Sequence, residues 1–502
     1  MKSQYRVVVI GGGVVGASVL YHLAKMGWSE IALIERSVLT AGSSWHAAGG
    51  VHALNADPNI AALQAYTINL LPEIEKESGQ NIGLHMTGGV NFAAAPERWE
   101  WLQHAYRVFQ TMGIDSCRLV GPEEIKEMLP VIDIAGVLGG LHDEGEGHVD
   151  PSGVVHAYAI AARKMGAAVV EHNRVLELHP RGDRCWEVVT EQGTVIAGHV
   201  VNAGGLWAKQ CGRMVGIDLP VTPLEHHYLV TETIPEVAAL ERELPFGIDL
   251  EGYTYMRQEG QGMLLGIYET SYQHWNMDGA PWDYGIELIQ EDIGRIAGEL
   301  EKGFARYPCL AEAGIKRWVN GAFTFTPDGN PLVGPVPGVP NYWAACGVMA
   351  GFLQGGGVGA RCGRIRLQRH AVDADREELR HLVEGVHPRL HRRRDRHGPL
   401  DRLGQGRFHW QTGRPGGARG RPGAPPGDPG GGRAGRRCRG LRAGLAGRAA
   451  GRFRHLGRLW PLPRKVAGDG AGRAGAGGAG NRAHGACGWR RAGGAGAGAV
   501  AP

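Results

Sequence analysis

Long apolar runs, paired cysteines and a secretory leader are all missing from this sequence. No window approaches the roughly 18 to 20 apolar residues that cross a membrane, and the apolar run after Arg6 passes directly into a glycine turn. The eight cysteines form no C-x-x-C pair, and no histidine lies at zinc-ligand spacing from two of them. We therefore expect a cytoplasmic protein with scattered reduced thiols, no membrane partner and no metal site.

Residues 361–502 lack most of the residue types that build a folded core. They contain one Lys, one Ile and no Tyr, against 33 Gly and 30 Arg. The same stretch has 31 basic and 9 acidic side chains, so residues 1–360 have 23 basic and 41 acidic ones. This composition predicts a disordered, low-complexity tail. The acidic charge of residues 1–360 makes nucleic acid an unexpected partner for that part.

The first 36 residues contain the pattern of a dinucleotide-binding unit. Residues 5–10 form a β-branched run typical of a buried parallel strand, residues 17–26 have apolar side chains at helical spacing, and residues 31–34 form a second short strand. The G-x-G-x-x-G motif between the first strand and the helix consists of Gly11, Gly12, Gly13, Val14, Val15 and Gly16. This order predicts a Rossmann-like βαβ unit.

Each part of this unit has a physical task. Gly11 makes a tight turn, Gly13 lets the backbone approach a pyrophosphate, and Gly16 lets the helix and the strand pack closely. The helix N-terminus attracts the pyrophosphate charge, and Glu35 would accept hydrogen bonds from ribose hydroxyls. The pattern alone does not distinguish FAD from NAD, and a purely structural glycine turn is the alternative.

Residues 35–50, E-R-S-V-L-T-A-G-S-S-W-H-A-A-G-G, resemble a segment of the dimethylglycine and sarcosine dehydrogenase family of flavoproteins. In that family the histidine of a G-S-x-W-H-A-A-G motif is joined covalently to the flavin. His46 is therefore the candidate flavin-linked residue, and an ordinary histidine bonded to backbone is the alternative. The resemblance implies FAD as the cofactor, with contacts from Glu35, Arg36, Gly42, Ser43, Ser44, Trp45, His46, Ala47, Ala48 and Gly49.

Three later segments resemble the same family. Residues 200–208 correspond to a strand and turn that approach the flavin and include Trp207, and in residues 168–178 Val175 takes the adenine-contacting position. Residues 326–359 correspond to the closing segment, which lies at the pyrimidine end of the flavin. The contacts implied for this segment come from Gly347, Val348, Met349, Ala350, Gly351 and Phe352.

Two further runs resemble the substrate-facing strands of the family, namely P-L-E-H-H-Y-L-V-T around His226 and Y-T-Y-M-R around Tyr255. The resemblance implies that both are catalytic: His226 could adjust the protonation of an amine, and Tyr255 could donate to a carboxylate. An ordinary core tyrosine is the alternative for Tyr255. Arg257 is a weaker candidate for the carboxylate, because an Arg followed by Gln and Glu is often solvated. His227 alternates to the opposite face of its strand and is expected to be structural.

The resemblance covers about residues 4–360 and implies an α/β fold, α+β overall, of two interleaved domains. We expect a Rossmann-like FAD-binding domain, a substrate domain built on an antiparallel sheet, and the Gly/Arg-rich tail. The expected boundaries are 1–83, 151–218 and 326–360 for the first domain, 84–150 and 219–325 for the second, and 361–502 for the tail.

The implied reaction is the FAD-dependent oxidative demethylation of a small N-methylated amino acid, of the dimethylglycine or sarcosine type. An N-methyl C–H gives a hydride to flavin N5, and water converts the resulting iminium ion to formaldehyde and the demethylated amine. The electron acceptor is left unknown. Two alternatives stay open: an inactive flavoprotein or interaction protein with a basic tail, and an amine oxidase of the D-amino-acid or proline type.

After Gly359 the family pattern continues with an apolar helix that packs on the nucleotide domain, and then with a folate-binding region. This sequence instead enters its Gly/Arg-rich stretch, so we expect both parts to be absent. The bias toward Gly and Arg is what an out-of-frame reading of GC-rich DNA would give, which predicts a frameshift origin. A nucleic-acid-binding tail is the alternative, although interleaved aromatic residues and a regular repeat are missing.

Overall fold

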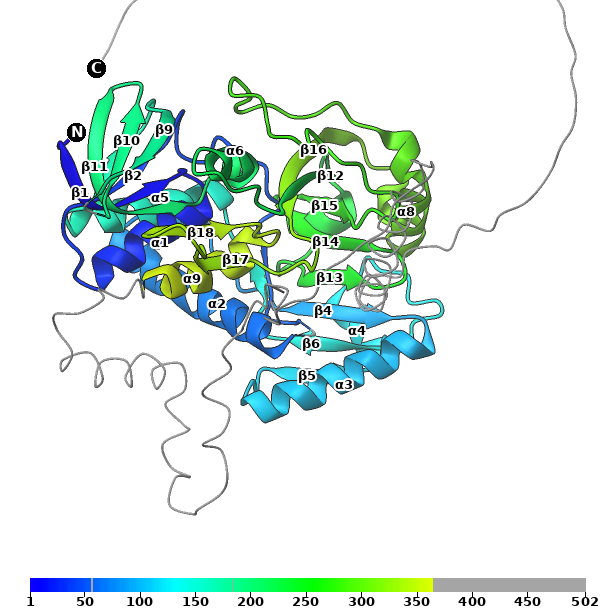
Figure 1. The fold of residues 1–502 in the computed structure, drawn as a ribbon. Helices are drawn as coiled ribbons and strands as arrows, with labels where there is room; N and C mark the ends of the chain where they lie inside the picture. The colour runs from blue at the N-terminus through cyan, green and yellow to red at the C-terminus, as the bar shows by residue number, and fades with distance from the viewer. Residues whose placement is uncertain (56, 183, 364–502) are drawn as a thin grey trace, which may run out of the picture. The chain divides into compact units, whose positions relative to one another are not determined.

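The computed structural model describes residues 1–55, 57–182 and 184–363 (Figure 1). The predictions of a disordered, frameshift-derived tail therefore lie outside the described residues. No helix within the described part of the chain is long and apolar enough to cross a bilayer.

The first sheet is built around the strands of the dinucleotide pattern. Its central strand β1 pairs in parallel with β2 on one side and β11 on the other, and the order across the sheet is β17-β18-β11-β1-β2-β8. β10 adds to β11 in antiparallel orientation and carries β9. The side chains of Val7, Val8 and Val9 are fully buried, which explains the continuous apolar run, because this parallel strand is covered on both faces. The strands are β1 (Gln4–Ile10), β2 (Ile31–Ile34), β8 (Ala168–Val170), β9 (Val175–Pro180), β10 (Trp186–Thr190), β11 (Gly193–Asn202), β17 (Leu332–Pro335) and β18 (Tyr342–Cys346).

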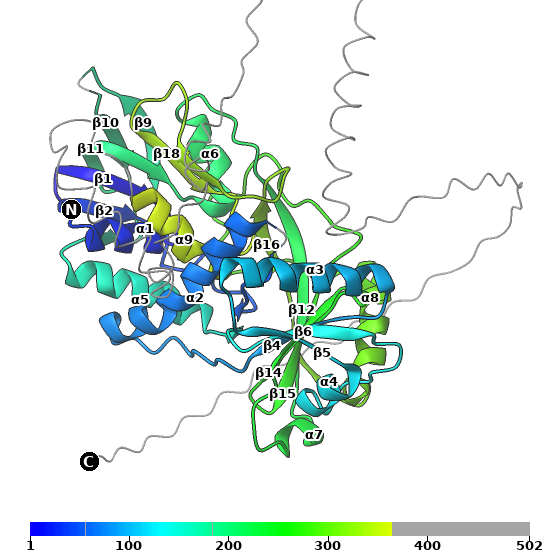
Figure 2. The same cartoon turned by 90° about the horizontal axis from the view of Figure 1, so that it is seen from below.

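Four helices pack on one another beside this sheet (Figures 1 and 2). They are α1 (Val14–Lys25), α2 (Pro58–Ser78), α5 (Pro151–Lys164) and α9 (Gly351–Gly363). The start of α2 is set by Asp57, whose side chain accepts hydrogen bonds from the backbone of Asn59 and Ile60, and its end by Gly79 in the left-handed conformation. Asp150 caps α5 in the same way.

The region in which we expected no closing helix lies, beyond Gly363, outside the described residues, and the helix α9 ends at that boundary. It begins within the glycine-rich segment rather than after Gly359, and it packs against α1 and α2. A Cβ atom on Gly357 would lie 2.5 Å from the side chain of Leu63 in α2, and Cys362, which the composition assigned to the tail, is buried. Glycine weakens a helix in isolation, but here the absent side chains permit the close packing.

The second sheet has the order β16-β12-β15-β14-β13-β4-β6-β5. We expected an antiparallel sheet, but the sheet is mixed because β4 and β13 pair in parallel. Helices α3 and α4 lie against its β4–β6 end, and α7 and α8 lie against β15. The elements are β4 (Gly89–Ala93), α3 (Pro96–Met112), β5 (Cys117–Val120), α4 (Pro122–Met128), β6 (Gly139–Asp143), β12 (Thr222–Thr231), α7 (Pro235–Ala238), β13 (Phe246–Asp249), β14 (Thr254–Glu259), β15 (Gly262–Ile267), α8 (Ile293–Arg306) and β16 (Ile315–Phe325).

Short elements connect these layers. β3 (Gly50–Val51) and β7 (Gly147–His148) form a two-stranded sheet that the sequence did not predict. The helix α6 (Ala208–Arg213) follows the 3-10 turn Gly205–Trp207, and a second 3-10 turn spans Pro308–Leu310. The strands of the first sheet come from residues 4–34, 168–202 and 332–346, and the domain boundaries themselves stay a prediction.

Candidate active site

A cavity lies where the carboxyl ends of the parallel strands of the first sheet face β12, β14 and β16 of the second. It encloses about 1170 Å³ of space not occupied by protein atoms, part of it open to solvent. Ligands of open α/β sheets bind at this edge of the sheet. The predicted site residues that line the cavity are Gly11, Gly13, Val14, Val15, Glu35, Gly42, Ser43, Ser44, His46, Ala47, Ala48, Trp207, His226, Tyr255, Gly347, Val348, Met349, Gly351 and Phe352.

The end of the cavity next to β1 has the features of a dinucleotide-binding site. Gly11 has φ +110°, and a Cβ atom there would lie 2.4 Å from the carbonyl oxygen of Ala203, so only glycine fits. The carboxylate of Glu35 accepts hydrogen bonds from the backbone N–H groups of Gly12, at 2.6 Å, and Ser37, at 2.9 Å. These bonds hold an acceptor at the end of β2, and burial raises the pKa of this carboxyl group.

The other predicted cofactor residues lie within the described part of the chain but do not line the cavity. Gly16 serves packing, because a Cβ atom there would lie 1.9 Å from the carbonyl oxygen of Gly11. The Arg36 guanidinium stacks 3.8 Å above the Trp207 ring and donates to the carbonyl oxygens of Trp282 and Tyr284. Arg36 therefore braces the wall that Trp207 forms instead of reaching into the cavity.

Four more predicted cofactor residues lie near the cavity but are not part of its lining. The Trp45 ring meets the His46 ring edge-on, with centroids 5.4 Å apart. Gly49, with φ +79°, leads into β3, and Ala350 packs on the core just before α9. The side chain of Val175 is buried in the core of the first sheet, so the predicted adenine contact does not come from a side chain on the cavity surface.

His46 lies at the junction between the two sheets. Its ring is buried, and its Nε2 atom has no hydrogen-bond partner among the described residues. The ring rests on the backbone of Gly321 in β16, where a Cβ atom would lie 2.2 Å from it. Burial lowers the pKa of His46 to about 4, and the neighbouring His226 acts in the same direction. The imidazole is therefore neutral at neutral pH, and His46 lines the cavity.

This unpartnered nitrogen is the feature that best fits an FAD in the cavity. Buried polar atoms are almost always hydrogen-bonded, so a buried ring nitrogen on a cavity wall points to a missing partner. The glycine cradle at Gly11 and the fixed acceptor at Glu35 suit the ADP half of the cofactor. These residues fit FAD at both ends of the cavity.

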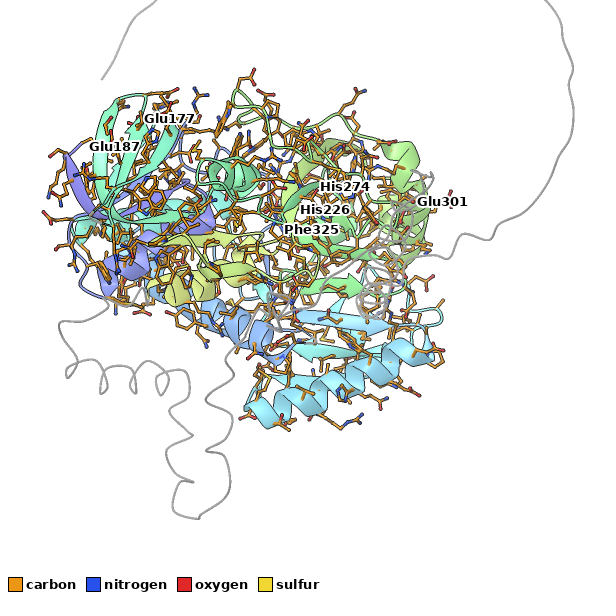
Figure 3. All side chains as sticks on the ribbon, in the orientation of Figure 1. Glu177, Glu187, His226, His274, Glu301 and Phe325 are labelled. Atoms are coloured by element: carbon orange, nitrogen blue, oxygen red, sulfur yellow. The ribbon has the colours of Figure 1, made fainter. Side chains whose placement is uncertain are left out.

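His226, which Figure 3 labels, forms a pair with Tyr255 on the second sheet. The His226 Nε2 atom lies 3.2 Å from the Tyr255 hydroxyl, and the two rings are stacked at an interplanar angle of 6°. The strand β15 runs between them, and the Tyr255 ring crosses it at Gly266, where a Cβ atom would lie 1.8 Å from the ring. Burial lowers the pKa of His226 to about 4 and raises that of Tyr255 far above its usual range. The pair thus offers a neutral proton acceptor and a neutral donor.

Two residues next to this pair, His227 and Arg257, make hydrogen bonds and ion pairs within the protein. The fully buried His227 ring hydrogen-bonds Glu269 through Nδ1 at 2.6 Å and accepts from the backbone of Asp292 through Nε2. Arg257, the weaker carboxylate candidate, donates to the carbonyl oxygen of Ala48 at 2.9 Å and pairs with Glu259 at 2.6 Å. It supports the backbone beside His46 instead of facing the cavity.

The sequence reasoning missed several lining residues. Tyr228 follows His226 by two positions on β12 and therefore points to the same face, which was a readable signal. Gly321 and Phe323 come from β16, and only its register with β12 places them at the cavity. The lining residues that lie in predicted segments but were not named singly are Ala203, Gly204, Gly205, Leu206, Tyr228, Ala345 and Cys346, and those outside them are Gly321, Phe323 and Thr324.

Comparison with known proteins agrees with the geometry of this cavity. The chain is 42% identical over 364 residues to the mitochondrial dimethylglycine dehydrogenase of Mus musculus, covering 71% of this chain and 42% of that protein. It is 32% identical over 366 residues to the mitochondrial sarcosine dehydrogenase of Mus musculus, covering 72% and 39%. The chain thus spans about two fifths of the length of these curated relatives.

A solved structure shares the fold. The crystal structure of L-proline dehydrogenase from P. horikoshii matches with a TM-score of 0.64 at 24% identity, over 72% of this chain and 93% of that one. The family model described as FAD dependent oxidoreductase matches residues 6–364, which is well over half of the chain. The α/β fold predicted from the sequence is confirmed, and the chain belongs to the family of FAD-dependent oxidoreductases.

Proposed function

We propose that this protein oxidatively demethylates a small N-methylated amino acid of the dimethylglycine or sarcosine type. The observation that carries the proposal is that the neutral His226–Tyr255 pair and the unpartnered Nε2 of His46 line one cavity. The similarity to a dimethylglycine dehydrogenase over 71% of this chain supports this substrate class.

The side chains of the cavity have distinct tasks in this reaction. Bound FAD supplies the two-electron acceptor for the hydride of an N-methyl C–H bond. The substrate ammonium group loses its proton to solvent, with the neutral His226 as a hydrogen-bond acceptor beside it, because only an amine with a free lone pair can stabilise the iminium ion left by hydride loss. Tyr255 donates a hydrogen bond to the substrate carboxylate and holds the methyl group in place. Addition of water to the iminium carbon then releases formaldehyde and the demethylated amine.

We further propose that His46 carries the flavin through a covalent bond from Nε2. His46 would hold FAD through this nitrogen, and joining the two would release two hydrogens to a two-electron oxidant such as dioxygen. The bond would prevent loss of the cofactor, and a nitrogen substituent that withdraws electrons would raise the reduction potential.

One preparation of the full-length protein tests both proposals. Acid precipitation should leave a yellow pellet from the wild type and a colourless one from His46→Ala, while His179→Gln, an exposed histidine, stays yellow. Anaerobic addition of dimethylglycine or sarcosine should then bleach the flavin. If neither compound bleaches a protein that has bound FAD, the substrate class is wrong. Bleaching by proline or a D-amino acid instead would favour another amine oxidase.

A further inference from the structure

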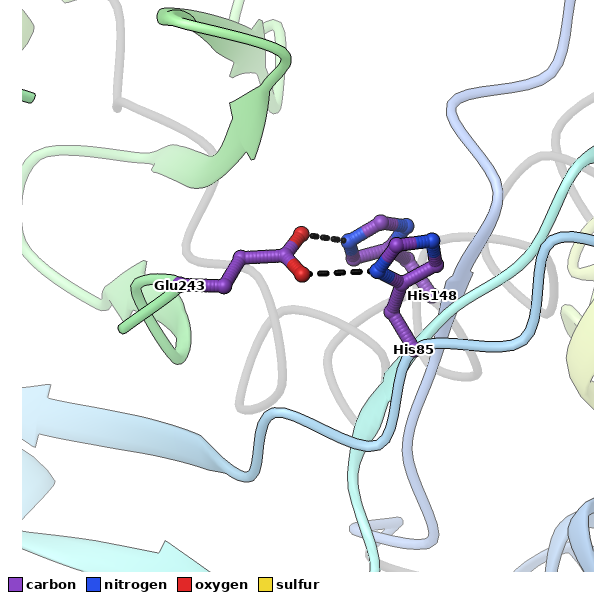
Figure 4. Close-up of side chains that lie close together, drawn as sticks. All are labelled: His85, His148 and Glu243. Atoms are coloured by element: carbon purple, nitrogen blue, oxygen red, sulfur yellow. Dashed lines mark hydrogen bonds and ion pairs between the residues drawn. The ribbon is translucent and has the colours of Figure 1, made fainter. Parts of the chain in front are cut away.

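A second cluster of chemically active side chains lies outside the cavity lining (Figure 4). His85 precedes β4, His148 ends β7, and Glu243 lies in the loop before β13. The two oxygens of the Glu243 carboxylate each contact one ring, at 2.6 Å from His85 Nδ1 and 2.7 Å from His148 Nε2. Three segments that are distant in sequence therefore converge on one point.

Backbone pairing fixes the two histidines relative to each other. His85 and His148 face each other in an antiparallel bridge, and each donates its backbone N–H to the other's carbonyl oxygen at 2.9 Å. Directly opposite residues of such a pair project their side chains to the same face. The rings accordingly stack with centroids 4.8 Å apart and an interplanar angle of 11°. Their nitrogens are presented side by side by the backbone, and Figure 4 shows both directed at Glu243.

We propose that His85, His148 and Glu243 bind a divalent transition-metal ion, with Zn²⁺ as the best match. The three ligand atoms all lie within 4.8 Å of one another. Ligands of a tetrahedral zinc ion at about 2.0 Å lie about 3.3 Å apart, which rotation of the rings and the carboxylate can reach. Two imidazole nitrogens with one carboxylate oxygen suit zinc and its first-row neighbours, whereas Ca²⁺ and Mg²⁺ prefer oxygen ligands.

The surroundings allow such an ion to enter and to stay. The side chain of His85 is half exposed, and those of His148 and Glu243 are 10% and 28% exposed. An ion can therefore reach the cluster, and water can complete the coordination. The nearby guanidinium of Arg257 is already paired with Glu259 at 2.6 Å, which reduces its repulsion of a cation.

The position of the cluster gives the ion a structural role. His148 pairs with Gly50 of β3, the strand that follows the segment bearing His46. A bound ion would tie the loop before β4, the strand β7 and the loop before β13 together behind that segment. No metal site was expected from the sequence, because its cysteines and histidines show no zinc-ligand spacing. His85, His148 and Glu243 become neighbours only through the fold.

Zinc binding by the full-length chain tests the proposal. After removal of metals by a chelator, the wild type should bind one more Zn²⁺ per chain than His85→Asn or Glu243→Gln, measured by calorimetry and by metal analysis after dialysis. The affinity of any remaining binding at this site should be at least about tenfold lower. His179→Gln is the matched control, because His179 forms an exposed pair with Glu177 alone, and it should bind as the wild type does.

Two further readouts separate this site from other ligands and from misfolding. Zn²⁺, but not Mg²⁺, should raise the melting temperature of the wild type and of His179→Gln, and leave that of His85→Asn unchanged. Co²⁺ at the site should give d–d absorption without a thiolate charge-transfer band, because no cysteine belongs to the cluster. Equal zinc stoichiometry and equal thermal response in the wild type and both cluster variants would overturn the proposal, as would a cobalt spectrum dominated by thiolate.

Discussion

Replacing Gly321 by alanine puts a methyl group into space that the His46 ring fills. The new Cβ atom would lie 2.2 Å from both Nδ1 and Cε1 of that ring. Carbon atoms in contact lie about 3.5 to 4.0 Å apart, so the ring or the strand must move by roughly 1.5 Å. The ring has little room to move, because it is buried and meets Trp45 edge-on.

We expect Gly321→Ala to lower the free energy of unfolding by about 1–3 kcal/mol, the usual cost of overpacking a buried site. It should also lower the fraction of flavin that survives acid precipitation, because Nε2 is displaced with its ring. Urea denaturation and absorbance of the acid-washed pellet measure the two effects. The control is Gly298→Ala in α8, where a Cβ atom would meet nothing within 4 Å and alanine should stabilise the helix by about 1 kcal/mol. A Gly321→Ala protein with unchanged stability and fully acid-stable flavin would refute the proposed placement of His46.

Three more substitutions test the packing and the charges. Burial lowers the pKa of His22 to about 4, so between about pH 6.5 and 4 the unfolded chain binds a proton that the native state does not. The free energy of unfolding should therefore decrease as the pH is lowered through this window. His22→Gln should flatten this slope by up to about 1.4 kcal/mol per pH unit. Arg295→Met leaves the buried carboxylate of Glu269 without its cation and should cost about 3–5 kcal/mol in urea denaturation. Gly357→Ala should cost about 1–3 kcal/mol although alanine favours helices, because its methyl group would meet Leu63, and melting temperature reports the loss.

Two of these predictions have a counterpart on the surface. Arg213→Ala breaks the pair with the exposed Asp218 and should cost less than about 1 kcal/mol. Replacing the exposed His179 by Gln should leave the slope of stability against pH nearly unchanged. If Arg295→Met and Arg213→Ala cost the same, or if His22→Gln keeps the full slope, the assigned burial of these groups is wrong.

The parts of the site that the sequence predicted best are local in the chain. Gly11 and Glu35 lie within one βαβ unit, where strand, turn and helix follow one another and leave a regular pattern. His226 and Tyr255 could be named only through resemblance to a family, because β15 separates their strands. Their contact depends on Gly266, which gives no signal in the sequence.

Other features were misjudged for definite physical reasons. The extent of α9 could not be predicted from its glycines, because local propensity disfavours a helix there and tertiary packing overrides it. The parallel pairing of β4 with β13 joins residues more than 150 positions apart. Nothing in the sequence of either strand identifies the other as its partner. Gly321 at the cavity wall and the His85–His148 bridge depend on strand register in the same way. The contacts assigned to individual cofactor residues stay predictions.

The position of α9 sets the order in which the cavity can be completed during synthesis. The cradle around Gly11 and the ring of His46 leave the ribosome early, but the cavity is also lined by Gly347 to Phe352 and its helices are closed by α9. At about 5–20 residues per second, roughly 15 to 60 s pass between these two events. The nascent chain must keep the apolar faces of α1 and α2 from aggregating during that interval. Completion of the cavity therefore waits for α9, although Gly11 and Glu35, which are predicted to contact the ADP half of FAD, are among the first residues to be made.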